Sequence, residues 1–329
     1  MGLMRADYQI TVDGNDVTAI ISPRLSSLTI KDERGFTSDT LEIVIDDRPD
    51  QSGHYIELPR KGVTLQVALG YNGKLTSMGK FVIDEANPSG PVERITISGK
   101  AADMRASMKV RRTRGWDNIT LADFVATIAA THQLKPKVSA ALAAITIARI
   151  DQADESDLHL ITRIGREFGA VVKPAYGFLL MVHKGEAKTA TGQLLPEVVL
   201  HKSDLSHWDV TLADRDKYSS VVARYWDLNA ADDIEVRAGD GEPEYRIRRT
   251  FSDQQSAQLA ADAKLKSLHR GTGQMQVTTA GHPNLVAEAT VNLTGMRPGL
   301  NEAWDIDAAT HTLDKNGGWK VALDLEMKS

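Results

Sequence analysis

The sequence predicts a mainly β protein with an α+β insert, in which two tube-like antiparallel β-barrel domains are related by internal duplication. A strand–turn–strand unit occurs twice, once through Phe81-Val82-Ile83-Asp84 and once through Trp304-Asp305-Ile306-Asp307. Each copy continues into a turn and a returning strand with alternating polarity. Alternating segments occupy both ends of the chain and helical periodicity lies mainly in the middle, which predicts two β-domains around an insert.

The first predicted domain, residues 1–108, consists of short strands with close turns. Asn72-Gly73 predicts a tight hairpin, because both residues tolerate positive φ. A second turn is expected at Asn87-Pro88-Ser89-Gly90. The expected strands run through Tyr8–Val12, Leu25–Ile30, Leu41–Ile45, Val63–Leu69, Phe81–Ala86 and Val92–Ile97. A set of strands this close together predicts a sandwich or barrel.

The middle block, residues 109–197, predicts a compact α+β insert. Thr120-x-x-Asp123 resembles a capping box at the start of a helix. A second helix is expected over Ser156–Phe168, and Gly169 supplies its stop. A hairpin is expected between 170–173 and 178–182. The apolar faces of the two helices consist of Leu121, Phe124, Val125 and Ile128, and of Leu158, Ile161, Ile164 and Phe168.

From residue 198 to residue 329 the strand pattern resumes, which predicts the second tube-like domain. One helix is expected inside it, and Ser252-x-x-Gln255 predicts its capping box. A turn at Asp314–Gly318 is expected to close the second copy of the repeated unit. The expected strands include 208–212, 220–226, 234–236, 245–248, 274–278 and 287–293.

Composition excludes several classes of function. The 329 residues include no cysteine, which excludes disulfides and Cys-ligated metal sites. The net charge of −5 predicts no general attraction to nucleic acid. The longest apolar run, around Ala140–Ala148, is far shorter than the roughly 20 residues of a spanning helix. We therefore expect no membrane insertion, and the N-terminus lacks the pattern of a secretory signal.

No motif predicts catalytic, cofactor-binding or metal-binding residues. His201 and His207 lie on either side of Asp204, but no histidine pair has metal-ligand spacing. Gly-x-Ser-x-Gly elbows and phosphate-binding glycine loops are missing from the sequence. Asp13-Gly14-Asn15-Asp16 lacks the twelve-residue pattern of a calcium loop and predicts a turn. We therefore expect no catalytic site, cofactor or metal.

A basic cluster marks the entrance to the insert: Lys109, Arg111, Arg112 and Arg114, followed by Trp116. Such a cluster can bind phosphates, but it lacks the extended footprint typical of nucleic-acid binding. We interpret it as a solvated connector or a subunit contact. A DNA-binding regulator remains a disfavoured alternative, and no sequence-specific binding of nucleic acid is expected.

Several segments carry a family resemblance. They are Trp116-x-x-Ile119-Thr120-Leu121, the run from Asp154 through Gly169, Gly177-Phe178-Leu179, and Gly299–Ile306 with His311 after it. Together with the order of domains, they resemble the late control protein D family of contractile-tailed phages and R-type pyocins. Members of that family are baseplate hubs, or tail tube initiators, related to the N-terminal hub region of VgrG.

The resemblance implies a structural protein that is not an enzyme. It implies a homotrimeric, pseudo-sixfold ring that joins the tail tube protein or tube initiator above to the spike protein below. Baseplate wedge proteins outside the ring and a tape-measure protein in its channel are further expected partners.

The expected location is the baseplate of a virion or phage-tail-like particle assembled in the bacterial cytoplasm. Because the chain ends at Ser329 without a β-helical needle, the spike is expected to be a separate polypeptide. The alternative reading is a tail-associated peptidoglycan hydrolase, because some tail-tip proteins carry lytic domains.

Overall fold

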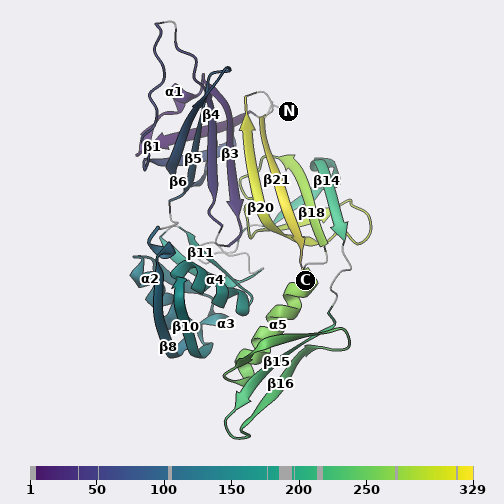
Figure 1. Cartoon of the computed structure of the whole chain (residues 1–329). Helices are drawn as coiled ribbons and strands as arrows, with labels where there is room; N and C mark the ends of the chain where they lie inside the picture. Colours follow the sequence, from purple (N-terminus) through teal and green to yellow (C-terminus); the bar gives the residue numbers. More distant parts are fainter. Residues whose placement is uncertain are drawn as a thin grey trace.

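The structure is a computed structural model. It describes residues 5–35, 37–50, 52–102, 106–175, 177–184, 195, 197–212, 218–270, 273–315 and 318–328. Strands make up more than half of the chain, so the mainly β prediction is confirmed. A large twisted sheet lies above two smaller bodies, the α+β insert and a sheet covered by one long helix (Figure 1).

The large sheet, which we call the tube sheet, has thirteen strands in the described part of the chain. Its main path runs in the order β14-β18-β21-β20-β3-β4-β7-β6-β5-β1-β2, while β19 joins β20 and β13 joins β19. The first half contains β1 (Ala6–Val12), β2 (Asn15–Asp16), β3 (Leu25–Glu33), β4 (Thr40–Asp46), β5 (Thr64–Tyr71), β6 (Lys74–Ser89) and β7 (Arg94–Ala101). The second half contains β13 (Val198–His201), β14 (Leu205–Leu212), β18 (Gly273–Ala280), β19 (Thr290–Thr294), β20 (Ala303–Asp314) and β21 (Gly318–Met327).

The two halves connect their strands in the same order. The neighbours in the first half are β3-β4-β7-β6-β5-β1, and in the second half β14-β18-β21-β20-β19-β13. Numbered along the chain within each half, and leaving out the two-residue β2, both orders are 2-3-6-5-4-1. One pairing differs, because β1 is antiparallel to β5 whereas β13 is parallel to β19.

The two copies of the repeated unit also share their irregularities. The register of β6 with β7 shifts between Ile83 and Glu85, and that of β20 with β21 shifts between Ile306 and Ala308. The extra residue at this β-bulge is therefore Asp84 in one copy and Asp307 in the other. Since a bulge re-aims the strand at one defined position, its recurrence gives a residue-by-residue correspondence between β6 and β20.

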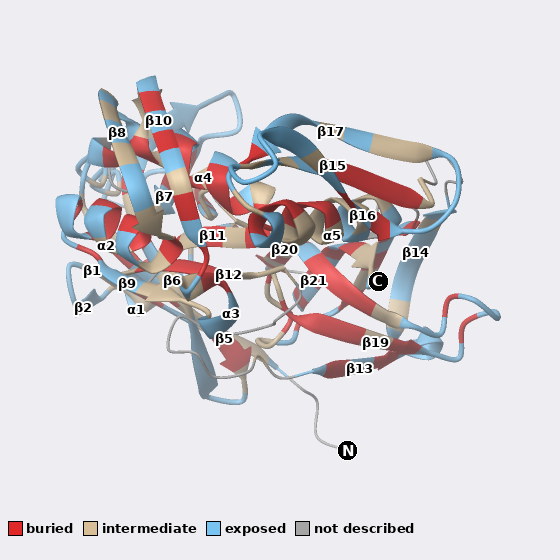
Figure 2. Cartoon of the chain, turned by 90° about the horizontal axis from the view of Figure 1, so that it is seen from below, coloured by how far each residue is buried: buried red, intermediate tan, exposed pale blue. Residues whose placement is uncertain are grey.

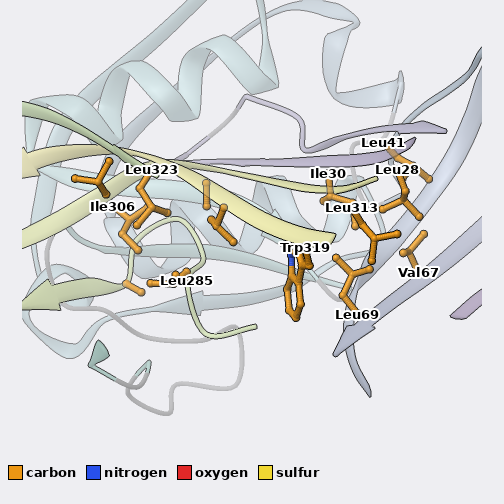
Figure 3. Packing of buried hydrophobic residues seen from close by; sticks show 14 of the residues in the cluster. Leu28, Ile30, Leu41, Val67, Leu69, Leu285, Ile306, Leu313, Trp319 and Leu323 are labelled. Carbon is orange, nitrogen blue, oxygen red and sulfur yellow. The ribbon is translucent and has the colours of Figure 1, made fainter. Parts of the chain in front are cut away.

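One hydrophobic core joins the two halves, so they do not have separate cores. Trp319 of the second half lies beside Leu69 and Leu313, where the two halves meet (Figure 3). The rings of Tyr71 and Trp319 are 5.3 Å apart between centroids. Aromatic contacts of this kind contribute about 0.5–1.5 kcal/mol beyond the burial of area. The halves are therefore held together by packing as well as by strand pairing.

The insert folds around a core of its own. Thr120 caps α2, since its side chain accepts a hydrogen bond from the Asp123 amide, and Ser156 caps α4 in the same way through the His159 amide. Both predicted helices and the predicted hairpin are confirmed. The elements are η1 (Ala106–Lys109), β8 (Arg111–Thr120), α2 (Leu121–Thr131), β9 (Lys135–Val138), α3 (Ala140–Ala143), β10 (Thr146–Ser156), α4 (Asp157–Glu167), β11 (Ala170–Ala175) and β12 (Phe178–His183).

Three strands assigned from sequence to the second tube-like domain belong to a separate body. They are β15 (Ser220–Asp227), β16 (Asp232–Gly239) and β17 (Glu244–Phe251), which form their own sheet under α5 (Gln254–Arg270). This body has its own small core and is inserted between β14 and β18. Strand alternation predicts that a segment is a strand but not which sheet it joins. The helix cap also differs from the prediction, because the Ser256 amide donates to Asp253.

Two turn predictions have different outcomes. β6 continues through Ser89, so the predicted turn at Asn87–Gly90 is wrong and the chain turns between Ser89 and Arg94 instead. In the second copy β20 ends at Asp314 and β21 begins at Gly318, close to the predicted turn. Residues 316–317 of that turn lie outside the described residues. The remaining elements are α1 (Thr18–Ile21) and η2 (Lys202–Asp204).

Candidate functional site

The halves of the tube sheet meet edge to edge at β3 and β20. These strands are antiparallel, with Thr29 opposite Thr312 and Glu33 opposite Ala308. Such a junction satisfies the backbone groups of two edge strands that would otherwise be open to a partner. The chain therefore contains one complete example of how a first-half edge joins a second half.

The counterpart of β3 in the second half, β14, has no such neighbour in the described part of the chain. Both strands carry a bulge at the same place, between Leu25 and Ser27 and between Leu205 and His207. Leu28 therefore corresponds to Trp208. Leu28 is fully buried, whereas Trp208 is 36% exposed. Figure 2 shows β14 as exposed along most of its length.

Residues 308–314 of β20 pair with β3, and the corresponding segment of β6 lacks such a partner strand among the described residues. By the shared bulge, the segment 85–89 of β6 corresponds to 308–312 of β20. Strand β5 accompanies β6 only as far as Val82, and the remainder pairs with β7 alone within the described ranges. Among the described residues, none pairs with the other edge of 85–89. The sheet thus has a donor edge at β14 and a matching acceptor edge at β6.

The face of the tube sheet opposite the core is polar in both halves. In the second half it forms a shallow groove of about 500 Å³. Carboxylates and amides line most of it, among them Asp209, Gln274, Gln276, Asp324 and Glu326. In the first half the same face carries Thr29, Lys31, Glu42, Ser98 and Lys100, which are exposed or half-buried. The face therefore presents mixed charge and hydrogen-bonding groups but little apolar surface.

A partly buried lysine, Lys173, ties the insert to both halves of the sheet. The ammonium group of Lys173 on β11 donates to Asp32 Oδ1 at 2.9 Å, to the Glu33 carbonyl at 3.0 Å and to Asp39 Oδ1 at 3.1 Å. Asp32 also accepts a hydrogen bond from the Ala287 amide of the second half. We call Lys173, Asp32, Asp39 and Glu288 the junction cluster.

Charge in the junction cluster is unbalanced. Burial raises the pKa of Asp39 to about 7, against the opposing attraction of Lys173. Burial also raises the pKa of Glu288. Burial alone would lower the pKa of Lys173, but the carboxylates of Asp32, Asp39 and Glu288 outweigh it and raise that pKa. Asp32 and Asp39 both accept from the one ammonium group, and burial favours the protonated forms of Asp39 and Glu288.

A second set of ion pairs lies beside the junction cluster. Arg34 of the first half contacts Asp307 at 3.0 Å and Glu326 at 3.1 Å in the second half. Lys184, just after β12 of the insert, also contacts Glu326. Because the Arg34 side chain is only 8% exposed, this contact is better shielded from solvent than an ordinary surface pair. Together the two clusters fix the insert against the sheet.

One group of side chains has the composition of a catalytic triad. Ser107 Oγ lies 2.9 Å from His132 Nδ1, and His132 Nε2 lies 2.8 Å from Asp157 Oδ2. Burial opposes ionisation of Asp157, but bonds from Gln152, His132 and Arg114 keep its pKa below the usual value. The group joins the C-terminal end of α2 to the first turn of α4, and we interpret it as structural.

The three arginines of the basic cluster, which was predicted to be a connector or subunit contact, pair with two carboxylates of the insert. Arg111 pairs with Asp154 at 2.8 Å, Arg112 and Arg114 pair with Asp157, and Arg114 also lies over the Trp116 ring. These arginines hold β8 against β10 and α4.

His201 and His207 are not brought together around a metal. The His201 ring accepts a bond from the Ser203 amide, and Asp204 accepts from the His201 amide, so this segment is a local cap. No group of three metal-ligating side chains occurs among the described residues. In the same part of the chain, no helix is long and apolar enough to cross a membrane.

The residues of the junction cluster were missed from sequence. Asp32, Lys173 and Glu288 are separated by more than a hundred positions each, and each is an ordinary charged residue in its local pattern. Only the pairing of β3 with β20 and the docking of β11 bring them together. For the open edge at β14, the sequence offered one signal, the large apolar residue Trp208 on an alternating strand. Strand alternation alone does not show whether such a residue faces the core or an interface.

Comparison with known proteins adds independent information. The model of a family described as phage tail baseplate hub (GPD) matches residues 40–317. The probable baseplate hub protein of Escherichia phage P2 is 30% identical over 98% of this chain and 93% of its own length.

Solved structures share the fold at lower identity. The 43 kDa tail protein of prophage MuSo2 from Shewanella oneidensis has a TM-score of 0.69 at 14% identity, with 97% of this chain and 98% of that chain covered. A tail protein from Neisseria meningitidis MC58 has a TM-score of 0.68 at 15% identity, covering 98% and 96%.

Proposed function

Because the chain belongs to the phage tail baseplate hub (GPD) family, we propose that three copies close into a ring joining the tail tube to the central spike. Each copy would supply two similar halves of a tube sheet, so that three copies give six units. The number of copies follows from the family resemblance. The way in which they join is supported by the strand edges of this chain.

The observation that carries the proposal is the junction between β3 and β20. The same junction between copies would place β14 of one copy along residues 85–89 of β6 in the next. Transferring the register through the shared bulges pairs Val210 with Pro88 and Asp209 with Ser89. The open edge of β14 and the open edge of residues 85–89 would then each have a partner strand. Trp208 would lie opposite Gly90 of the next copy.

The polar face of the sheet is proposed to line the channel of the ring. A lumen that lets another polymer pass must be wetted and must not offer apolar contacts that hold the cargo. Both halves present such a face, with the polar groove around Gln276 and Asp324 in the second half. A tape-measure protein or DNA is the expected cargo in this channel.

The insert and the body under α5 lie at one end of the tube sheet (Figure 1). We propose that this end faces the separate spike protein and that the opposite end faces the tail tube protein or tube initiator. Baseplate wedge proteins would contact the outside. The ring would assemble in the bacterial cytoplasm and remain in the baseplate of the completed tail.

We infer that the chain is not an enzyme. The family is structural, and the Ser107–His132–Asp157 group ties its carboxylate to arginines. This supports a packing role over peptidoglycan hydrolysis. A second serine–histidine pair, Ser203 Oγ and His201 Nδ1 at 2.8 Å, belongs to the local cap at η2.

The proposed ring is tested by the mass of the purified protein in solution. Sedimentation equilibrium over a wide range of concentration should give a species of about three times the 35.9 kDa of one chain. A chain that stays monomeric at the highest concentration, alone and with the spike protein, would contradict the ring.

A further inference from the structure

We propose that the connection from Asp47 to Gly62, which we call the arm, folds over Trp208 of a second copy of this chain in the ring. This inference rests on the proposed function and adds a contact to it. Figure 1 shows the arm rising beyond the strand ends, at the end of the sheet away from the insert. We infer the surface that the arm contacts from the way in which the two halves of one chain meet.

The arm has a counterpart in the second half, and both connections begin and end alike. The amide of Asp47 donates to the Glu93 carbonyl at 3.1 Å, and the amide of Gly281 donates to the Trp319 carbonyl at 2.8 Å. At the other end, the amides of Gly62 and Glu288 donate to the carbonyls of Ile83 and Ile306, at 3.0 Å and 2.9 Å. The arm is therefore the longer version of the connection between Gly281 and Glu288.

The shorter connection lies at the junction between halves. The amide of Ala287 donates to Asp32 at 2.8 Å, and Glu288 accepts from the amide of Gly35 at 3.3 Å. Leu285 in the same connection is fully buried. A connection in this position thus contacts the end of the edge strand donated by the other half, at Asp32 of β3 and at Gly35 just after it. In the ring, the corresponding strand beside the arm is β14 of a second copy.

The start of the arm is placed by its hydrogen bond to the hairpin of β6 and β7. Asp47 is bonded to Glu93, and Gly90 of the same hairpin is the position expected opposite Trp208 of the next copy. The arm therefore leaves the sheet beside the neighbouring Trp208. In the isolated chain the Trp208 side chain is 36% exposed there, with the Lys202 ammonium group 5.7 Å from its ring centroid.

The chemistry of the arm fits a cover for that ring. Tyr55 is 60% exposed and Leu58 is 45% exposed, whereas the rest of the arm is mostly polar. Pro49 and Pro59 restrict the backbone on either side, which reduces the entropy lost on docking. A turn held by Asp50, whose side chain accepts from the amides of Ser52 and His54, shapes the tip. Two apolar side chains on a braced loop are suited to an aromatic partner.

Photo-cross-linking tests the contact directly. A benzophenone amino acid replaces Tyr55 in the full chain, and an equal amount of isotope-labelled chain without the probe is mixed in before assembly. The expected product is a cross-link from position 55 to the labelled segment that contains Trp208. The matched control places the probe at Leu228, which is 86% exposed on the separate body, and should give no cross-link to β14.

Double replacement of Tyr55 and Leu58 by Ser gives a second readout. Burial of an apolar side chain of this size lowers a dissociation constant about tenfold or more. We therefore expect the dissociation constant between copies to rise at least tenfold. Unchanged melting of the isolated chain would show that the fold is intact.

The outcomes separate the arm from the ring. Cross-links from position 55 only within one chain, in protein whose ring forms normally, would overturn the arm contact and leave the ring standing. Absence of any ring, with and without the arm substitutions, would overturn both.

Discussion

Leu28 and Trp208 occupy the same position in the two halves of the tube sheet, but Leu28 is fully buried whereas Trp208 is 36% exposed. Leu28 is covered because β20 pairs with β3 in the same chain. Strand β14 has no equivalent neighbour in the described ranges. A ring of copies would remove this difference, because β14 would gain a neighbouring strand from a second copy.

Replacing Trp208 with Ser is expected to weaken assembly without unfolding the chain. The Trp208 side chain is 36% exposed in one copy, so its loss should destabilise a monomer less than the loss of a fully buried side chain of the same size. The Leu28→Ala variant is the matched control, since removing a fully buried leucine should cost about 2–5 kcal/mol of stability. Sedimentation velocity and urea denaturation measure the two effects. Equal loss of stability in both variants would contradict the assignment of Trp208 to an interface.

Replacing Lys173 with Met should destabilise the junction of the insert with the sheet. The substitution leaves Asp32 and Asp39 without their ammonium partner, and breaking a buried pair in this way costs about 3–5 kcal/mol. Adding Asp39→Asn should recover part of the loss, because one unpaired carboxylate is removed. Urea denaturation of the single and double variants measures it. A double variant less stable than Lys173→Met would count against the junction cluster.

Stability should fall as pH rises toward neutrality because of Asp39. Its pKa in the folded protein is raised to about 7 by burial, so the folded state binds a proton that the unfolded state has released. The folded state therefore binds more protons between about pH 4 and pH 7, and the free energy of unfolding decreases with pH in that range. The Asp39→Asn variant should lack this part of the pH dependence. Parallel slopes for the two proteins in urea titrations from pH 5 to pH 8 would refute it.

Neither the parent chain nor its Ser107→Ala variant is expected to hydrolyse cell walls. The chain is expected to give no clearing zone on a peptidoglycan gel, and the variant should lose at most about 1 kcal/mol of stability from one hydrogen bond. Zymography and thermal melting of both proteins test this. Clearing by the parent chain that disappears in the variant would revive the hydrolase alternative.

Local sequence signals predicted local structure well. The predicted cap at Thr120 places the start of α2, and the helix expected over Ser156–Phe168 is α4, because these signals depend on residues only a few positions apart. The Asn72-Gly73 hairpin follows from two residues that adopt positive φ. The repeated Ile-Asp pair marks the bulge in both halves, although sequence alone indicated only alternating strands.

Relationships between distant segments could not be predicted in the same way. The β15–β17 sheet has the same alternation as the tube strands, so its separation required tertiary structure. The Asn87–Gly90 turn signal was overridden by the pairing of β6 with β7 through Ser89. The contact of Lys173 with Asp32 joins residues 141 positions apart, and no periodic pattern reports such a pair.

Disulfide trapping tests the ring most directly, because the chain has no cysteine of its own. Ser89→Cys and Asp209→Cys are expected to face each other between copies, at the close spacing of antiparallel partners that a disulfide requires. Thr29→Cys with Thr312→Cys is the positive control, since these residues are partners within one chain and should give a cross-linked monomer. Ser89→Cys with Thr211→Cys is the control for register.

Oxidation of the Ser89→Cys, Asp209→Cys protein is expected to yield a covalent trimer on a denaturing gel. The Thr29→Cys, Thr312→Cys protein is expected to stay a cross-linked monomer. A covalent ladder without a closed trimer, or trapping at Thr211 but not at Asp209, would contradict the proposed junction between β14 and β6.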